Sequence, residues 1–180
     1  MDPLPRLRLA RLDEIDAIDD LMKRTTREIF PRYYDAEQTD ASVAHISSVD
    51  PMLVEDGTYF VIEAGVELVA CGGWSRRDKL YTGSGGGDDD ARLLDPKTEP
   101  ARVRAMFVRP DWTRRGLGTM ILEASETAAR SEGFRTLALM STMPGLPLYK
   151  RYGFTVDETA DITMPNDVTI AGASMSKPID

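Results

Sequence analysis

The segment that most constrains this chain is a basic, glycine-bearing turn with the sequence TRRGLG at residues 113–118. An apolar stretch typical of a strand precedes it at residues 103–108, and an amphipathic helical pattern follows it. A strand, a turn and a helix N-terminus in this order form an anion site, because the first helical N–H groups lack intrahelical partners and carry the positive end of the helix dipole. Gly116 and Gly118 leave those N–H groups uncovered, and Arg114 and Arg115 add charge. These residues predict a bound pyrophosphate.

Two common phosphate-binding motifs do not fit this turn. A dinucleotide-binding fingerprint needs a third glycine, but Ile121 stands at that position. A P-loop needs a longer glycine spacing followed by Lys and Ser or Thr, and the turn has no such lysine. The turn therefore belongs to a different class of phosphate site.

Composition limits the function classes that remain. The 180 residues are enough for one domain with a sizeable core, which we place at 1–180. The formal net charge of −8 is a poor match for a nucleic-acid partner, whose phosphates require an excess of Lys and Arg. The single cysteine excludes an internal disulfide, and the sequence shows no zinc-type spacing of Cys and His. With neither a signal peptide nor a membrane-spanning run in the sequence, we expect a cytoplasmic protein with no membrane partner.

Hydrophobic periodicity predicts alternating strands and helices. We expect helices from Asp13 to Pro31, from Asp40 to Val49, over 116–132 and over 144–152, and strands at 7–9, 58–62, 68–74, 102–108, 134–140, 154–156 and 168–175. Residues 82–100, which contain a run of glycines and aspartates, are expected to form a flexible loop within one domain. The order indicates an α/β (α+β) fold, with a central mixed sheet and helices on both faces.

Two motifs resemble those of one known family. The turn at 113–118 resembles the acyl-CoA loop of the GNAT superfamily of N-acyltransferases, Q/R-x-x-G-x-G/A, although Thr113 stands at the Q/R position. The segment LYKRYGF at residues 148–154 is similar to the family's F/L-Y-x-x-x-G-F motif. The element order also resembles the GNAT fold, so the resemblance covers nearly the whole chain.

The resemblance implies an acetyl-CoA site and a set of site residues. Tyr149 would be the catalytic acid that protonates the departing CoA thiolate, and no metal is implied. The backbone of the strand before the turn would pair with the pantetheine arm, and hydroxyls after the next strand would contact it weakly. The implied cofactor-binding residues are Met106, Phe107, Val108, Arg114, Arg115, Gly116, Leu117, Gly118, Thr119, Ser141 and Thr142.

The implied activity is transfer of an acetyl group from acetyl-CoA to a primary amine, by direct attack in a ternary complex. The alternative is a non-catalytic acyl-CoA-binding sensor or regulator with the same fold; a protein-interaction module with a fortuitous glycine turn is a third reading. The acceptor would be a small-molecule amine or a protein amine, and association as a homodimer is left open.

The general base and the acceptor subsite stay undecided by the sequence. Glu28, Asp35 and Glu37 are candidate bases, with a solvated surface charge as the alternative for each. Arg104, with Trp74 and Arg76, would form a subsite for an acceptor carboxylate, unless Arg104 pairs with a nearby acid. Structural or solvated roles are expected for His45, Cys71 and the aspartate run 88–90.

Overall fold

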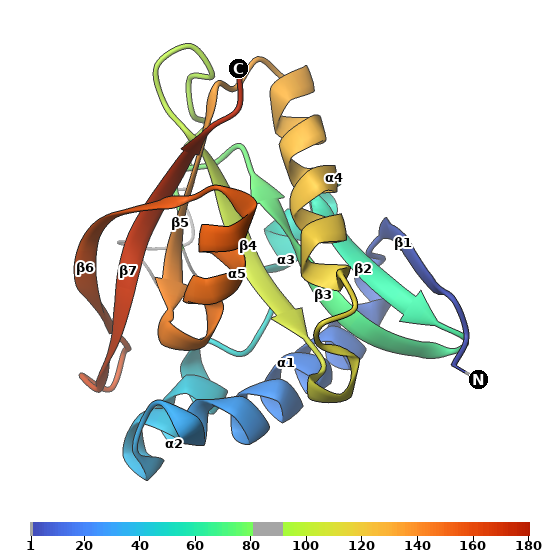
Figure 1. The fold of residues 1–180 in the computed structure, drawn as a ribbon, viewed down its shortest axis with the longest axis vertical. Coiled ribbons are helices and arrows are strands. Elements are labelled where there is room, and N and C mark those ends of the chain that lie inside the picture. Colours follow the sequence, from blue (N-terminus) through green and yellow to red (C-terminus); the bar gives the residue numbers. More distant parts are fainter. Residues whose placement is uncertain (1, 81–91) are drawn as a thin grey trace.

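A seven-stranded mixed sheet forms the centre of the molecule (Figure 1). The computed structural model describes residues 2–80 and 92–180. The strand order is β1-β2-β3-β4-β5-β7-β6, and β4 and β5 form its parallel pair. The strands are β1 (Pro5–Leu9), β2 (Tyr59–Ala64), β3 (Glu67–Ser75), β4 (Ala101–Val108), β5 (Thr136–Thr142), β6 (Thr155–Thr163) and β7 (Thr169–Pro178). The sheet agrees with the predicted fold class.

Helices cover both faces of this sheet. They are α1 (Ile15–Ile29), α2 (Ala36–His45), α3 (Pro51–Glu55), α4 (Leu117–Ser131) and α5 (Leu146–Tyr152). Alternate residues of a strand point to opposite faces, and β2 divides its core accordingly. Val61 packs with residues of α1 and α3, whereas Ile62 packs with Leu117 and Ile121 of α4. The sheet therefore separates α1 and α3 from α4.

The predicted second helix is wrong in its boundaries. It was expected over residues 40–49, but α2 begins at Ala36 because Asp35 is an effective N-cap. The Asp35 carboxylate accepts a hydrogen bond from the Gln38 backbone N–H at 2.8 Å, and the Gln38 side chain accepts one from the Asp35 N–H at 2.9 Å. Pro51 does not follow the end of this helix but begins α3, capped by Asp50.

The segment expected to be a flexible loop, residues 82–100, is described only from residue 92 onward. There Leu94 is buried in the core beside Trp74, and the Arg92 guanidinium donates to the Glu99 carboxylate at 2.6 Å. The glycine run and the aspartates at 88–90 lie outside the described residues, so their expected roles stay predictions.

The parallel pairing of β4 and β5 is very short. Its register contains Ala101 opposite Leu137 and Arg102 opposite Ala138. Beyond these pairs the two strands diverge, although β5 stays paired with β7 from Thr136 to Thr142. The second half of β4 therefore has one edge that makes no backbone pairing with β5, although β4 lies inside the sheet.

A bulge bends β4 where this divergence begins. The pairing of β3 with β4 changes register between Cys71 and Gly73, and Ala105 has a φ of +50°, which is rare for a residue with a side chain. The hydroxyl of buried Tyr59 donates to the Ala105 carbonyl at 2.6 Å. Burial raises the pKa of Tyr59 well above its ordinary value, so the phenol stays a donor. Tyr59 thus holds the bulge in place.

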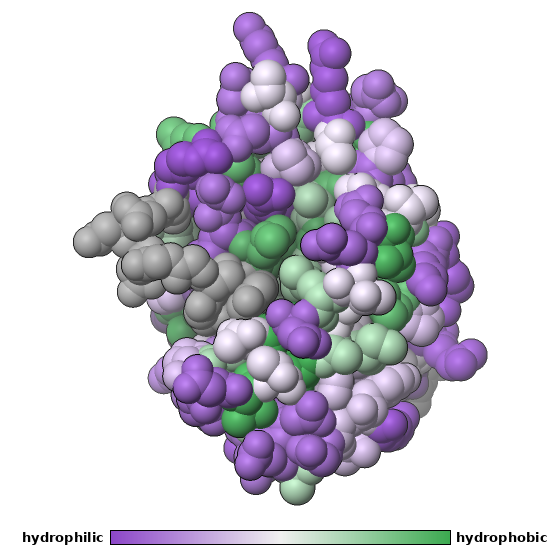
Figure 2. Space-filling model, turned by 90° about the vertical axis from the view of Figure 1, so that its left-hand side faces the viewer, coloured by the Kyte–Doolittle hydropathy of each residue, from purple (hydrophilic) through white to green (hydrophobic). Residues whose placement is uncertain are grey.

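The surface is largely hydrophilic on the side of β6 and β7. Figure 2 shows apolar residues there as separate areas among polar ones. Among the residues that the structure describes, no helix has the length and apolar character needed to cross a membrane.

Replacing Tyr59 with Phe should lower the free energy of unfolding by about 1–3 kcal/mol, because the Ala105 carbonyl loses its buried donor. Urea unfolding measures the change. Tyr33→Phe is the matched control, because Tyr33 is 50% exposed and its hydroxyl makes no hydrogen bond with the described residues. Equal stability of the two variants would show that the hydroxyl does not hold the bulge.

Candidate active site

A hollow of about 830 Å³ lies in the gap between β4 and β5. Val103 and residues 105–108 of β4 line one side, and residues 139–142 of β5 line the other. Residues from α4 and α5 line it from one face of the sheet, and residues from α1 and the segment after it line it from the opposite face. The hollow therefore passes through the sheet where the strands diverge.

The TRRGLG turn lies at the α4 end of this hollow. Arg114 has a φ of +63° and Gly116, the N-cap of α4, has a φ of +79°. No side chain caps the helix, and the Met120 N–H is the first to bond back, to the Gly116 carbonyl at 3.0 Å. The N–H groups of Leu117, Gly118 and Thr119 are thus left for another acceptor. The geometry is that of an anion-binding concavity.

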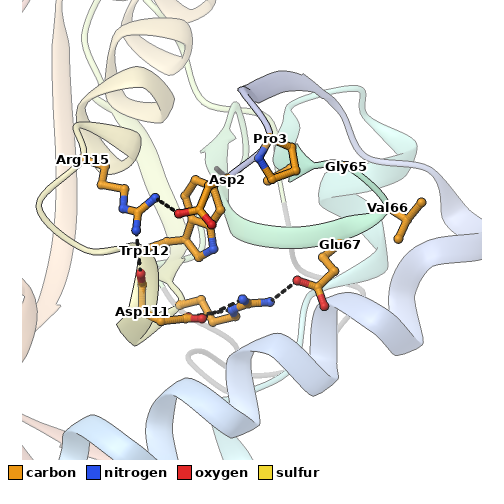
Figure 3. Close-up of a pocket in the computed structure, with 10 residues that line it drawn as sticks. Asp2, Pro3, Gly65, Val66, Glu67, Asp111, Trp112 and Arg115 are labelled. Atoms are coloured by element: carbon orange, nitrogen blue, oxygen red, sulfur yellow. Dashed lines mark hydrogen bonds and ion pairs between the residues drawn. The ribbon is translucent and has the colours of Figure 1, made fainter.

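The two arginines of the turn point to different places. Arg114 lines the hollow and makes no ion pair with the described residues. Arg115 instead stacks on the Trp112 ring, 4.3 Å from its centroid, and its Nη1 lies 2.7 Å from Asp2 Oδ2 (Figure 3). The structure thus brings Arg114, but not the Arg115 side chain, to the predicted phosphate site.

Arg115 belongs to a second hollow of about 700 Å³, between the N-terminal segment and the β2–β3 hairpin (Figure 3). Its other arginine, Arg109, lies 2.7 Å from Asp111 and 3.1 Å from Glu67. Both cations are already neutralised by carboxylates. This hollow therefore offers an anion much less free charge than the first one does.

The glycines of the turn have different structural roles. A Cβ at Gly118 would lie 2.6 Å from Leu148 Cδ2, so Gly118 lets α4 and α5 pack closely. A Cβ at Gly116 would meet no atom within 4 Å, and its positive φ is what requires glycine there. Gly118 was assigned to phosphate binding from the sequence alone; its packing against Leu148 is an additional reason for glycine.

The predicted pantetheine strand has a free edge on the hollow. Met106, Phe107 and Val108 all line it and have no ladder partner in β5. Ser141 and Thr142 line the opposite side, but the Ser141 hydroxyl donates to the Thr142 carbonyl at 2.7 Å. A ligand amide could therefore pair with the β4 backbone more readily than with Ser141.

Tyr149, on α5, lines the hollow. Its side chain is 8% exposed and packs edge-on against Phe154 at a centroid distance of 5.8 Å. A Cβ at Gly145 would lie 2.9 Å from the Tyr149 ring, so glycine at 145 makes room for it. Burial raises the pKa of Tyr149, which keeps the phenol protonated at neutral pH. A protonated phenol facing the hollow can donate a proton.

None of the three candidate bases lines the hollow. Glu28 lies 3.6 Å from Arg24 on the surface of α1, Asp35 caps α2, and Glu37 is exposed. The described residues that line the hollow include no Asp, Glu or His, and no group of three possible metal ligands occurs in the described ranges. The structure thus supports the solvated or capping role for each of the three carboxylates.

The expected carboxylate subsite does not form around Arg104. Arg104 is buried and its Nη2 lies 3.7 Å from Asp50 Oδ2, as the ion-pair alternative predicted. Arg76 pairs with Glu132 at 2.8 Å and lies over the Trp74 ring, on the α4 side of the sheet. None of the three lines the hollow. Cys71 is a core residue whose pKa is raised by burial to about 12.

Sequence reasoning missed the residues that close the hollow on the α1 side. Thr25, Ile29, Arg32, Tyr33 and Ile46 line it there. None of them belongs to a recognisable motif, and only the tertiary fold brings residues 25–46 beside β4 and β5. The available signal was the apolar stripe that Ile15, Ile18, Met22 and Ile29 form along α1, but such a stripe does not distinguish core residues from residues that line a cleft.

The fold is similar to several solved acetyltransferase structures. A GCN5-related N-acetyltransferase from Rhodopseudomonas palustris aligns with a TM-score of 0.73 and 15% identity, over 99% of this chain and 98% of that one. PaiA N-acetyltransferase from Thermoplasma acidophilum, in complex with coenzyme A, aligns with a TM-score of 0.70 and 12% identity, over 97% and 99%. YncA from Salmonella typhimurium, with its cofactor acetyl-CoA, aligns with a TM-score of 0.63 and 15% identity, over 98% of this chain and 94% of that one.

At these identities the likeness to solved structures establishes the fold. The family follows from the sequence itself, because the pattern described as the acetyltransferase (GNAT) family matches residues 15–154. That range runs from the start of α1 to Phe154 and includes the turn, β4 and Tyr149. The chain belongs to the GNAT family of acetyltransferases.

Proposed function

We propose that the protein transfers an acetyl group from acetyl-CoA to a primary amine. One observation carries this proposal: a single hollow joins the uncapped N-terminus of α4, the free edge of β4 and the buried phenol of Tyr149. An anion site, a strand edge and a proton donor in that arrangement match the pyrophosphate, the amide-bearing arm and the thioester of one acyl-CoA molecule. Family membership and neighbours that hold CoA or acetyl-CoA support the same reading.

The reaction needs no covalent enzyme intermediate. The unprotonated amine nitrogen attacks the thioester carbonyl carbon, a C–N bond forms, and the C–S bond breaks as the tetrahedral intermediate collapses. Tyr149 donates its proton to the departing thiolate, and the proton lost by the attacking nitrogen restores the phenol through water. Acetyl-CoA and the amine thus become the N-acetylated amine and CoA.

Acetyl-CoA should stabilise the protein against unfolding. Its binding should depend on Arg114. A ligand at ~100 times its dissociation constant adds about 2.7 kcal/mol to the free energy of unfolding, which a thermal-shift assay detects. Arg114→Gln should weaken binding roughly 10-fold, because an unpaired guanidinium at the phosphate site is removed.

Arg115→Gln is the matched control, because it makes the same change at the neighbouring position, where the side chain pairs with Asp2 instead. An Arg115 effect as large as that of Arg114 would contradict this placement of the phosphates. No thermal shift with millimolar acetyl-CoA would contradict the proposed function.

Tyr149→Phe should reduce kcat roughly 100-fold with little change in acetyl-CoA affinity. The substitution keeps the ring packed against Phe154 and removes only the proton donor, and general acids contribute ~100- to 10,000-fold. Tyr152→Phe is the control, because Tyr152 lies on the same helix but its hydroxyl contacts Glu126 at 3.3 Å, away from the hollow. Wild-type turnover in Tyr149→Phe, with chemistry rate-limiting, would assign Tyr149 to packing.

The pH dependence gives a further check on Tyr149. Burial disfavours the phenolate and therefore raises the pKa of Tyr149, so the acid form persists as the pH rises through the neutral and mildly alkaline range. At pH values under ~10, the ordinary pKa of a phenol, loss of this proton should cause no decrease in the wild-type rate. A descending limb that is centred below pH ~10 and disappears in Tyr149→Phe would contradict the raised pKa of this phenol.

An acyl-CoA sensor of the same fold is distinguished by turnover. A screen of amines that follows thiol release and product mass should find CoA release from acetyl-CoA. Binding of acetyl-CoA with no CoA release for any amine would favour the sensor.

A further inference from the structure

The two ends of the hollow have different chemistry. The end beside α4 carries the uncapped N–H groups, which suit the phosphates. The end on the opposite face of the sheet is lined by residues from α1 and the chain after it: Thr25, Ile29, Arg32, Tyr33 and Ile46, which we name the acceptor wall. If acetyl-CoA enters from the α4 side, as the proposed function requires, the amine approaches along the acceptor wall.

The acceptor wall carries one formal charge, and it is positive. Arg32 is exposed and makes no ion pair or hydrogen bond with the described residues. Arg24, which lies on α1, by contrast forms an ion pair with Glu28. Because the described lining residues include no carboxylate, Arg32 keeps its charge available within a protein of net charge −8. Such a wall attracts an anion and repels a polyamine.

The rest of this end of the hollow is apolar. Ile29 and Ile46 of the acceptor wall line it together with Phe30, and Met140 and Ile162 line it from the sheet. Tyr33 adds a half-exposed aromatic ring at the same end. An acceptor that filled this space would therefore present an apolar group as well as an anion.

We propose that the acceptor is a small amine that also carries a carboxylate and an apolar side chain, as α-amino acids such as leucine do, and that Arg32 binds the carboxylate. The guanidinium presents paired donors that match a carboxylate. The inference rests on the proposed function.

The test compares leucine with leucinamide and 3-methylbutylamine, at equal concentrations of unprotonated amine, with spermidine as a polycation. CoA release and product mass are measured at saturating acetyl-CoA. Leucine should have the highest kcat/KM of the four. Arg32→Gln should raise the KM for leucine roughly 10- to 100-fold, with kcat and the KM for acetyl-CoA nearly unchanged, and should not affect leucinamide or 3-methylbutylamine.

Matched variants separate this role from a general loss of charge or fold. Arg27→Gln removes an exposed arginine from α1 outside the hollow and should leave the KM for leucine unchanged. Arg32→Lys should recover part of the affinity, because it restores the charge without the paired donors.

The outcomes distinguish this inference from the proposed function. Preference for spermidine or 3-methylbutylamine, or an Arg32→Gln effect equal for all amines, would overturn the carboxylate acceptor and leave acetyl transfer intact. An effect of Arg32→Gln on the KM for acetyl-CoA alone would move Arg32 to the cofactor and also overturn the inference. Acetyl-CoA binding with no acetylation of any amine would overturn both.

Discussion

The divergence of β4 from β5 is the constraint on which the rest of this structure depends. The strands pair at residues 101–102 and then separate, which leaves main-chain groups of β4 without ladder partners inside a covered sheet. Buried main-chain groups need hydrogen-bond partners, so the gap favours an elongated ligand that brings its own amides. The bulge at Ala105, held by Tyr59, keeps the gap open. The helices on both faces then become walls of a site.

The hollow keeps three arginines without an ion pair to the described residues, where a ligand would need them. Arginines on the outer surface are largely neutralised, as Arg8 is by Glu14 and Glu63, and Arg109 is by Asp111. The arginines that line the hollow, namely Arg32, Arg114 and Arg151, make no ion pair with the described residues. The acidic net charge of the chain therefore does not conflict with an anionic substrate, because the local field differs from the average.

The sequence predicted those helices, strands and turns whose formation depends on residues only a few positions apart. The strand, turn and helix around residues 103–131 and the helix ending at Gly153 were predicted because apolar periodicity, positive-φ glycines and caps act over a few residues. The start of α2 was missed because a capping box at Asp35 outweighed the apolar pattern that suggested a later start. The direction of Arg115 and the position of Arg32 could not be predicted, because each depends on contacts with distant segments, Asp2 in one case and the β4–β5 gap in the other.

The motif residues that identified the family serve packing as well as binding. Gly118 admits Leu148, and Gly145 admits the Tyr149 ring, so both glycines bring α5 against α4 and the gap. These motif glycines therefore also position the Tyr149 phenol beside the free edge of β4. Packing of the core does not restrict Arg32 and Tyr33 of the acceptor wall in this way. Both are exposed and could be replaced without disturbing the core. The acyl-donor end of the site is therefore fixed by the fold, whereas the acceptor end can be changed by substitutions on one helix and the chain that follows it.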